Sequence, residues 1–286
     1  MRKATQPHGR RRPRSREHRA PPRPHLANRH ATALRACVPS RRGNRAQRAY
    51  RRHQGRPHQA RKLPPAPDLP EQPIPAEFDY DRWLGPTPWR PYHEQRVLGD
   101  YGAGWRRFTE YGGRKNGDWG AHHFDIIQWA LGMDQSGPVE FIPKGYEGTE
   151  FQTHVYANGV RVERVGDDLK AMIEFTGTKG KVWVSRDDYL ETDPPELATR
   201  PVRADEIHLY VSDNHHTDFF NCVRTRQHPI ADVEIGHRSA TVGHLNNIAA
   251  AVGRPIRWDP STETIVGDAV ASTMLDRPRR APYGLL

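Results

Sequence analysis

The chain has 286 residues, of which 35% are hydrophobic and 27% are charged, and its formal net charge at pH 7 is +10. A chain of this length accommodates one or two domains, and no apolar run approaches the roughly 18 residues that a membrane span requires. The charge is uneven, because residues 1–66 carry a net +19, with Glu17 as their one acid, whereas the remainder carries −9.

Residues 1–66 consist mostly of Arg, Pro, His, Ala, Gln, Gly and Ser and lack Ile, Phe and Trp. Such a segment cannot bury enough apolar surface to offset the entropy of ordering it, so we expect it to be disordered. It could be a basic tail for nucleic acid or acidic surfaces, an Arg-rich targeting peptide, or a GC-rich stretch translated out of frame. Aromatic residues do not interleave with the arginines, which argues against a nucleic-acid partner.

The two cysteines, Cys37 and Cys222, form neither a CxxC pair nor a disulfide framework. Their number fits a reducing compartment. With no export signal or membrane span recognisable in the sequence, we expect a soluble, cytoplasmic protein without a membrane partner.

A Pro-rich linker is expected over residues 67–77, followed by one domain over residues 78–286. Between Trp83 and Tyr92, three prolines exclude a regular helix or a central strand, so we expect an irregular segment held by its aromatic rings. The polar, Pro-containing residues 187–206 are expected to form an excursion from the fold.

Hydrophobic periodicity predicts a largely antiparallel α+β fold, because the strands and the helices are grouped separately instead of alternating. Asn158 and Gly159 predict a hairpin turn of type I′, with positive φ at both positions, and residues 178–180 predict a second turn. Helices are expected over residues 118–131, 214–226, 233–252 and 268–275. Strands are expected over residues 139–142, 151–156, 160–165, 170–175, 181–185 and 255–258.

Asp118 and His122 are the strongest candidates for chemistry. Residues four apart on a helix share one face, and a carboxylate beside an imidazole can orient it as a general base for a hydroxyl proton. Alternatively, Asp118 only caps the helix and His122 is structural. A metal site with His122, His123 and Asp125 is disfavoured because adjacent helical histidines point about 100° apart.

Several motifs extend this pattern. Residues 117–134, which begin Gly-Asp-Trp-Gly-Ala-His-His-Phe-Asp, resemble the D-x-G-x-H-x-x-D segment of the Gfo/Idh/MocA oxidoreductases, the glucose–fructose oxidoreductase and inositol dehydrogenase superfamily. Segments beginning at Trp83, Trp89, Asn214, Asp232 and Arg277 are similar to its bacterial-type subgroup. The resemblance covers about residues 67–286.

The resemblance implies an α+β domain whose open, mainly antiparallel sheet has helices on one face and supports homo-oligomers. It implies His122 as general acid/base, Asp118 as its partner, a carbohydrate substrate, and NAD or NADP bound by a Rossmann domain. That domain's Glu-Lys-Pro segment and G-x-G-x-x-G fingerprint are absent from the sequence. We therefore expect the nucleotide-binding half to be missing and the chain alone to be inactive.

Substrate-binding candidates are residues with aromatic faces for sugar C–H groups or with donors for hydroxyls: Trp89, Arg90, Tyr92, Trp105, Arg106 and His123. The alternative for Trp89 and Tyr92 is that they only fix a coil segment. A second hypothesis for the whole chain is a non-catalytic sugar-binding or oligomerisation module.

Overall fold

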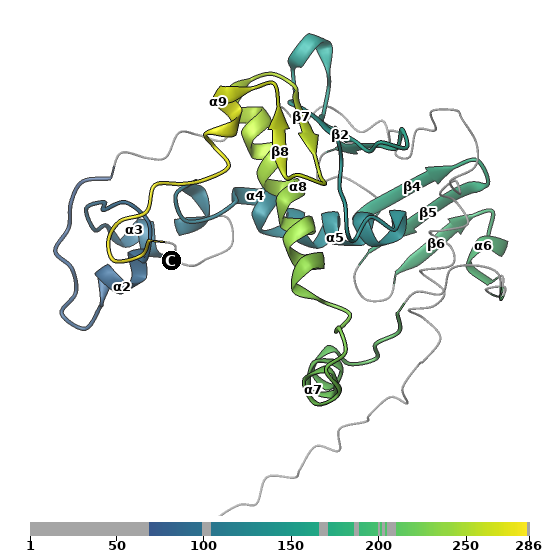
Figure 1. The fold of residues 1–286 in the computed structure, drawn as a ribbon, viewed down its shortest axis with the longest axis horizontal. Helices are drawn as coiled ribbons and strands as arrows, with labels where there is room; N and C mark the ends of the chain where they lie inside the picture. The colour runs from purple at the N-terminus through teal and green to yellow at the C-terminus, as the bar shows by residue number, and fades with distance from the viewer. Residues whose placement is uncertain are drawn as a thin grey trace, which may run out of the picture.

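The computed structural model describes residues 69–98, 104–165, 171–185, 189–199, 201, 204 and 210–284. The predicted basic segment 1–66 and Cys37 lie outside the described residues. Figure 1 shows two sheets joined by two long helices, with a group of short helices at one end of the molecule. The α+β class and its antiparallel, open sheets are confirmed.

The larger sheet has five antiparallel strands in the order β3-β2-β1-β7-β8. Phe141 lies opposite His154 on one neighbouring strand and opposite Ile256 on the other, and all three side chains are buried. Alternation therefore places one face of the sheet in the core. Its strands are β1 (Glu140–Ile142), β2 (Gln152–Val155), β3 (Arg161–Arg164), β7 (Ile256–Asp259) and β8 (Thr264–Val266).

The smaller sheet consists of β4 (Ile173–Gly177), β5 (Gly180–Val184) and β6 (Leu190–Asp193). Thr178 and Lys179 form its first turn, as predicted. The residues expected to form a polar excursion instead supply β6 and the short helix α6 (Glu196–Thr199). That prediction is wrong because the backbone of β6 pairs with β5 whatever the polarity of its side chains.

Helices α5 (Trp119–Leu131) and α8 (Val233–Val252) pack against each other and form the centre of the molecule (Figure 1). Gly132 ends α5 in the left-handed conformation that glycine favours. The side chain of Asp232 caps α8 by accepting a hydrogen bond from the Glu234 amide. A second bond crosses between the helices, from the Ser239 hydroxyl to the Asp125 carboxylate, at 2.8 Å.

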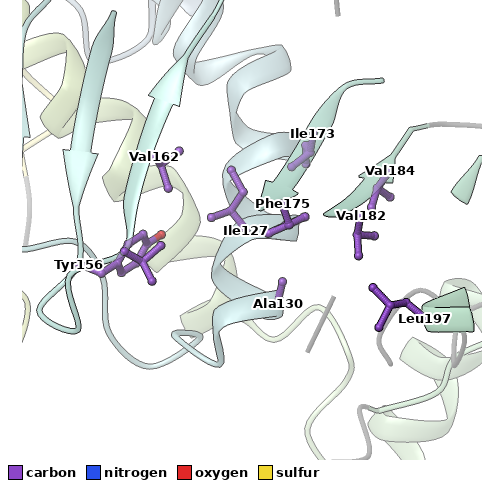
Figure 2. Close-up of a cluster of buried hydrophobic side chains, with 10 residues drawn as sticks. Ile127, Ala130, Tyr156, Val162, Ile173, Phe175, Val182, Val184 and Leu197 are labelled. Carbon is purple, nitrogen blue, oxygen red and sulfur yellow. The ribbon is translucent and has the colours of Figure 1, made fainter. Parts of the chain in front are cut away.

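The end of α5 contributes to a core that it shares with both sheets, drawn in Figure 2. Ile127 points toward Phe175 of β4 and lies across from Val162 of β3. This burial fixes the rotation of α5 about its axis, and so decides which of its residues are left at the surface.

Helix α7 (His215–Thr225) stands apart from this body in Figure 1. Phe219 and Phe220 are 55% and 61% exposed, whereas Cys222 is buried.

An aromatic cluster precedes α5. It contains Tyr80 and Leu84 of α2 (Tyr80–Leu84) together with Tyr92, all buried. From Gly85 to Tyr92 the chain is irregular, as expected of the prolines there. The C-terminal segment crosses back to this cluster, where the Arg280 guanidinium donates to the Asp81 carboxylate at 2.6 Å.

Short helices complete the fold: α3 (Glu94–Val97), η1 (Gly104–Arg107), α4 (Arg114–Gly117), η2 (Tyr146–Gly148) and α9 (Ala269–Ser272). No helix among the residues that the structure describes is long and apolar enough to cross a membrane.

The hairpin between β2 and β3 differs from the predicted type. Gly159 has a φ of 82°, but Asn158 is not among the residues with positive φ. The Gly159 amide donates to the Tyr156 carbonyl at 2.8 Å, so the turn is centred on Ala157 and Asn158 and followed by a left-handed glycine. This three-residue loop has the twist that a hairpin needs while requiring only one positive φ.

Candidate functional site

Asp118 lies at the position directly before the first residue of α5. Its side chain caps no backbone amide there, so the interpretation of Asp118 as a simple N-cap finds no hydrogen bond to support it. Its carboxylate instead accepts a hydrogen bond from Nε of Arg106 at 3.1 Å, in an ion pair whose side chains are 32% and 19% exposed. The carboxylate is thus held at the surface end of the helix by a cation.

His122 is exposed on the first turn of α5. Its ring meets that of Trp119 edge to face, with the centroids 6.1 Å apart. Within the described part of the chain, no hydrogen bond joins His122 to Asp118. Asp118 lies before the helix with φ −91° and ψ −101°, so the helical spacing of residues four apart does not fix the distance between the two side chains. An exposed imidazole is a group that can take up and release a proton.

Arg106 connects this helix start to the preceding segment. Its guanidinium lies 4.4 Å from the centre of the Trp105 ring, over its face. Both residues belong to η1, whose position is fixed by a hydrogen bond from the Trp105 amide to the Leu98 carbonyl. The structure therefore brings two of the predicted substrate residues, Trp105 and Arg106, together with Asp118.

Two glycines allow this part of the chain to pack closely. A Cβ atom on Gly113 would lie 2.6 Å from the Gly117 Cα, and one on Gly120 would lie 3.1 Å from the Lys115 carbonyl oxygen. Both contacts are with the chain itself, so these glycines fit α4 against α5 and place Asp118 between the two helices.

A buried amide, Asn116, fixes the loop just before Asp118. Its Nδ2 donates to Asn247 Oδ1 of α8 at 2.8 Å and to Gln152 Oε1 of β2 at 3.2 Å, and its Oδ1 accepts from Arg164 of β3. Asn247 in turn donates to the Gly113 carbonyl at 2.9 Å. Sequence reasoning missed this cluster, because its members are separated by 36 to 131 residues and no motif connects them.

The structure does not bring the other substrate candidates into contact with Asp118 or His122 among the described residues. Trp89 is 55% exposed and lies edge-on to Tyr80, and Arg90 pairs with Glu110 at 3.5 Å. Tyr92 is buried against Tyr80, with the ring centroids 5.2 Å apart. Tyr92 therefore packs in the aromatic cluster, while Trp89 and Arg90 keep surfaces that a ligand could touch.

His123 is half-buried, one position further round α5. Among the residues that the structure describes, no three His, Cys, Asp or Glu side chains are placed to hold a metal ion.

Trp119, which was not predicted as a site residue from the sequence, is 41% exposed beside His122. Its exposure could not be read from the sequence, because a tryptophan in the first turn of a helix could equally be buried.

The described residues do not fit a nicotinamide dinucleotide. Every strand pair they form is antiparallel, so they contain no parallel βαβ unit whose glycine-rich turn and helix N-terminus would hold the pyrophosphate. Around the start of α5 the described residues present an exposed imidazole, a carboxylate, a guanidinium and two indole rings.

Residues 65–285 match a protein family described as "Oxidoreductase family, C-terminal alpha/beta domain", of the Gfo/Idh/MocA group. An NAD-binding protein from Listeria innocua is 15% identical with a TM-score of 0.34, over 56% of this chain and 55% of that chain.

An oxidoreductase from Agrobacterium radiobacter, solved in complex with NAD+, L-tartaric acid and magnesium, is 15% identical with a TM-score of 0.32, over 50% and 48%. The chain thus spans about half the length of these solved structures. No curated protein matches it.

Proposed function

Because the chain belongs to the Gfo/Idh/MocA oxidoreductase family and matches its C-terminal domain, we propose that it forms the substrate side of an oxidoreductase. The substrate class is a sugar, polyol or glycoside whose hydroxyl group is oxidised or formed by reduction. The cofactor class is NAD or NADP, as the resemblance implies. Since the described residues do not fit a dinucleotide, the proposal assigns them proton transfer and substrate positioning only.

The observation that carries the proposal is the arrangement at the start of α5. His122 is exposed there, and the Asp118 carboxylate lies directly before the helix, held by Arg106 at 3.1 Å. In the proposed reaction, a ring nitrogen of His122 accepts the proton of the substrate hydroxyl, and the nearby carboxylate stabilises the imidazolium that forms. In the reverse direction the same imidazolium returns the proton to the oxygen.

Aromatic rings flank this pair and support a carbohydrate ligand. Trp119 contacts the His122 ring, and Trp105 carries the Arg106 guanidinium on its face. Indole faces stack on the C–H groups of a sugar ring, while a guanidinium donates hydrogen bonds to its hydroxyl groups. Trp105, Trp119 and Arg106 are therefore proposed to contact the substrate, with Trp89 and Arg90 as more distant candidates.

The face of the five-stranded sheet opposite α5 and α8 is proposed to join two copies of the chain. On this face, one residue from each of the five strands lies directly opposite its neighbours on the adjacent strands, so that the five form a row across the sheet. That row consists of Arg161, Val155, Glu140, Arg257 and Val266. The row combines charged with apolar side chains, which suits an interface between copies that must also keep the free sheet from aggregating. Measurement of the molar mass by light scattering tests this.

A non-catalytic sugar-binding or oligomerisation module is the second candidate. The observation that favours it is the lack, among the described residues, of a fold that could bind a dinucleotide.

Replacing His122 with Ala separates the two functions in an enzyme that joins this chain to a dinucleotide-binding domain. The oxidoreductase proposal expects turnover to fall by about 10²- to 10⁴-fold, as for loss of a general acid/base, with NAD binding intact. His216→Ala, an exposed histidine on α7, is the matched control and should leave turnover unchanged. Equal turnover in His122→Ala and wild type would reject the catalytic role and favour the module.

A further inference from the structure

A cavity of about 500 Å³ opens beside the end of α5. Its lining comes from the end of α5 and the residues after it, from the loop between α7 and α8, and from the first turn of α8. Trp129 lines it and lies seven residues after His122, which is about 10 Å along the helix axis. The cavity is therefore distinct from the candidate site at the start of the helix.

Three apolar side chains line this cavity and are each half-buried: Trp129, Ile230 and Ile235. An indole ring and two branched aliphatic side chains provide a surface on which the C–H groups of a ligand can pack. Tyr210, just before α7, completes the lining. The rest of it belongs to residues 129–135 and 228–235, all of which the structure describes.

Two polar side chains of the lining are fixed through one atom and keep a second atom available. Nδ1 of His228 lies 2.8 Å from Oδ2 of Asp232. Oε1 of Glu234 accepts a hydrogen bond from Nε of Arg238 at 2.7 Å. Within the described ranges, neither Nε2 of His228 nor Oε2 of Glu234 has a hydrogen-bond partner. Because each group is already held in place, a ligand loses less of its binding energy to ordering it.

The available groups are mostly hydrogen-bond acceptors. An ionised carboxylate only accepts, so Nδ1 of His228 donates to Asp232, and Nε2 of the neutral ring is then an acceptor like Oε2 of Glu234. Gln135 is exposed at the cavity and its amide bonds to none of the described residues, so it offers one acceptor and one donor group. A matching ligand has several O–H donors, and the two carboxylates disfavour an anion.

We propose that this cavity is a binding site for a neutral monosaccharide. The C–H face of the sugar packs on Trp129, its hydroxyl groups donate to Glu234 and His228, and Gln135 exchanges hydrogen bonds with one further hydroxyl. The volume of about 500 Å³ lies within the roughly 300–1,000 Å³ that small-molecule sites occupy. Binding here requires neither His122 nor a nicotinamide cofactor.

Fluorine NMR of the full chain labelled with fluorotryptophan tests the site, because each of the seven tryptophans gives its own resonance. The resonance of Trp129 is the one missing from the spectrum of Trp129→Phe. Titration with D-glucose, D-galactose and D-mannose should shift it in a saturable manner with at least one of these sugars. No saturable shift with any of them would overturn the proposal.

The same spectra separate this site from the proposed oxidoreductase site, because Trp105 and Trp119 report on the start of α5. The shift at Trp129 should persist in His122→Ala. A sugar that shifts the resonances of Trp105 and Trp119 and leaves that of Trp129 unchanged would support the substrate site and overturn the one in the cavity.

Two variants and one charged ligand test the hydrogen bonds. The dissociation constant of the sugar should rise about fivefold in Gln135→Ala and in Glu234→Ala, as for loss of one hydrogen bond. Gln227→Ala, an exposed amide outside the lining, is the matched control and should bind like wild type. The uronate of the same sugar should bind more weakly. Unchanged affinity in both variants, or tighter binding of the uronate, would refute the proposal.

Discussion

Replacement of His154 by Leu should make the stability of the protein less sensitive to acid. His154 of β2 is 2% exposed, and its ring lies among those of Phe124, Phe141 and Tyr156, at centroid distances of 5.6 to 5.8 Å. Burial lowers the pKa of this imidazole from 6.5 to about 3, because a charged ring would lose its water there. Among the described residues it has a single polar contact, a weak hydrogen bond from Asn246 Nδ2 to its Nδ1 at 3.4 Å.

The direction follows from which state binds the proton. Between pH 6.5 and 3 the unfolded chain protonates His154 and the folded chain does not, so stability falls as the pH falls through this window. With these two pKa values, the loss between pH 7 and pH 5 is about 2 kcal/mol. Leucine has a similar volume and no titratable group, so that loss should disappear in His154→Leu.

Urea unfolding at pH 7, 6 and 5 measures this difference directly. The wild-type protein should lose about 2 kcal/mol more than the variant across the range, while other titrating groups contribute equally to both. If the two proteins show the same pH dependence, His154 is not held neutral in the folded state, and the reasoning from burial is refuted.

Four further substitutions test the packing by urea unfolding. Phe141→Ala removes a side chain that is 0% exposed and should lower the free energy of unfolding by about 3–5 kcal/mol. Phe220→Ala, on the exposed face of α7, should lower it by less than about 0.5 kcal/mol. Equal losses would contradict the assignment of Phe141 to the core. Gly180→Ala should lower the free energy of unfolding by about 2 kcal/mol or more, because φ at this position is 139° and the new Cβ would lie 2.0 Å from the Asp193 carbonyl oxygen. A variant as stable as wild type would disprove that contact. Ser239→Ala should cost about 1–2 kcal/mol by leaving the half-buried Asp125 without its 2.8 Å hydrogen bond; an unchanged midpoint would show that water replaces the hydroxyl.

The long helices could be predicted from the sequence because their ends have local signals. Asp232 and Asn214 cap α8 and α7 with their side chains, and Gly132 and Gly253 end α5 and α8 with positive φ. The strands from β1 to β5 were predicted for a similar reason, since alternation is visible within each strand.

The division into two sheets could not be predicted, because strand pairing depends on residues far apart in the chain. Strand β1 pairs with β7, more than 100 residues later, and β6 is polar, with Leu190 as its one apolar residue. The edge strand β8, in which Ile265 is the one buried side chain, was not predicted. Each of these strands is defined by the strand it pairs with, and its own sequence says little about which strand that is.

The same limit applies to the candidate site. Asp118 and His122 were recognisable by spacing and resemblance, and the structure places both at the start of α5. The ion pair of Arg106 with Asp118 and the hydrogen bonds of Asn116 were not predicted, because they bring together η1, α4, α8 and two strands. Spacing along a helix can suggest a pair of residues, but the groups that orient the pair come from the tertiary fold.

Asp118 and His122 are proposed to act as one acid/base unit. The most direct measurement is the kcat of His122→Ala, Asp118→Asn and the double variant, in an enzyme that joins this chain to a dinucleotide-binding domain. If the carboxylate works only through the imidazole, the double variant should lose no more activity than His122→Ala alone. Losses that multiply in the double variant would show that the two residues act independently and would contradict the account.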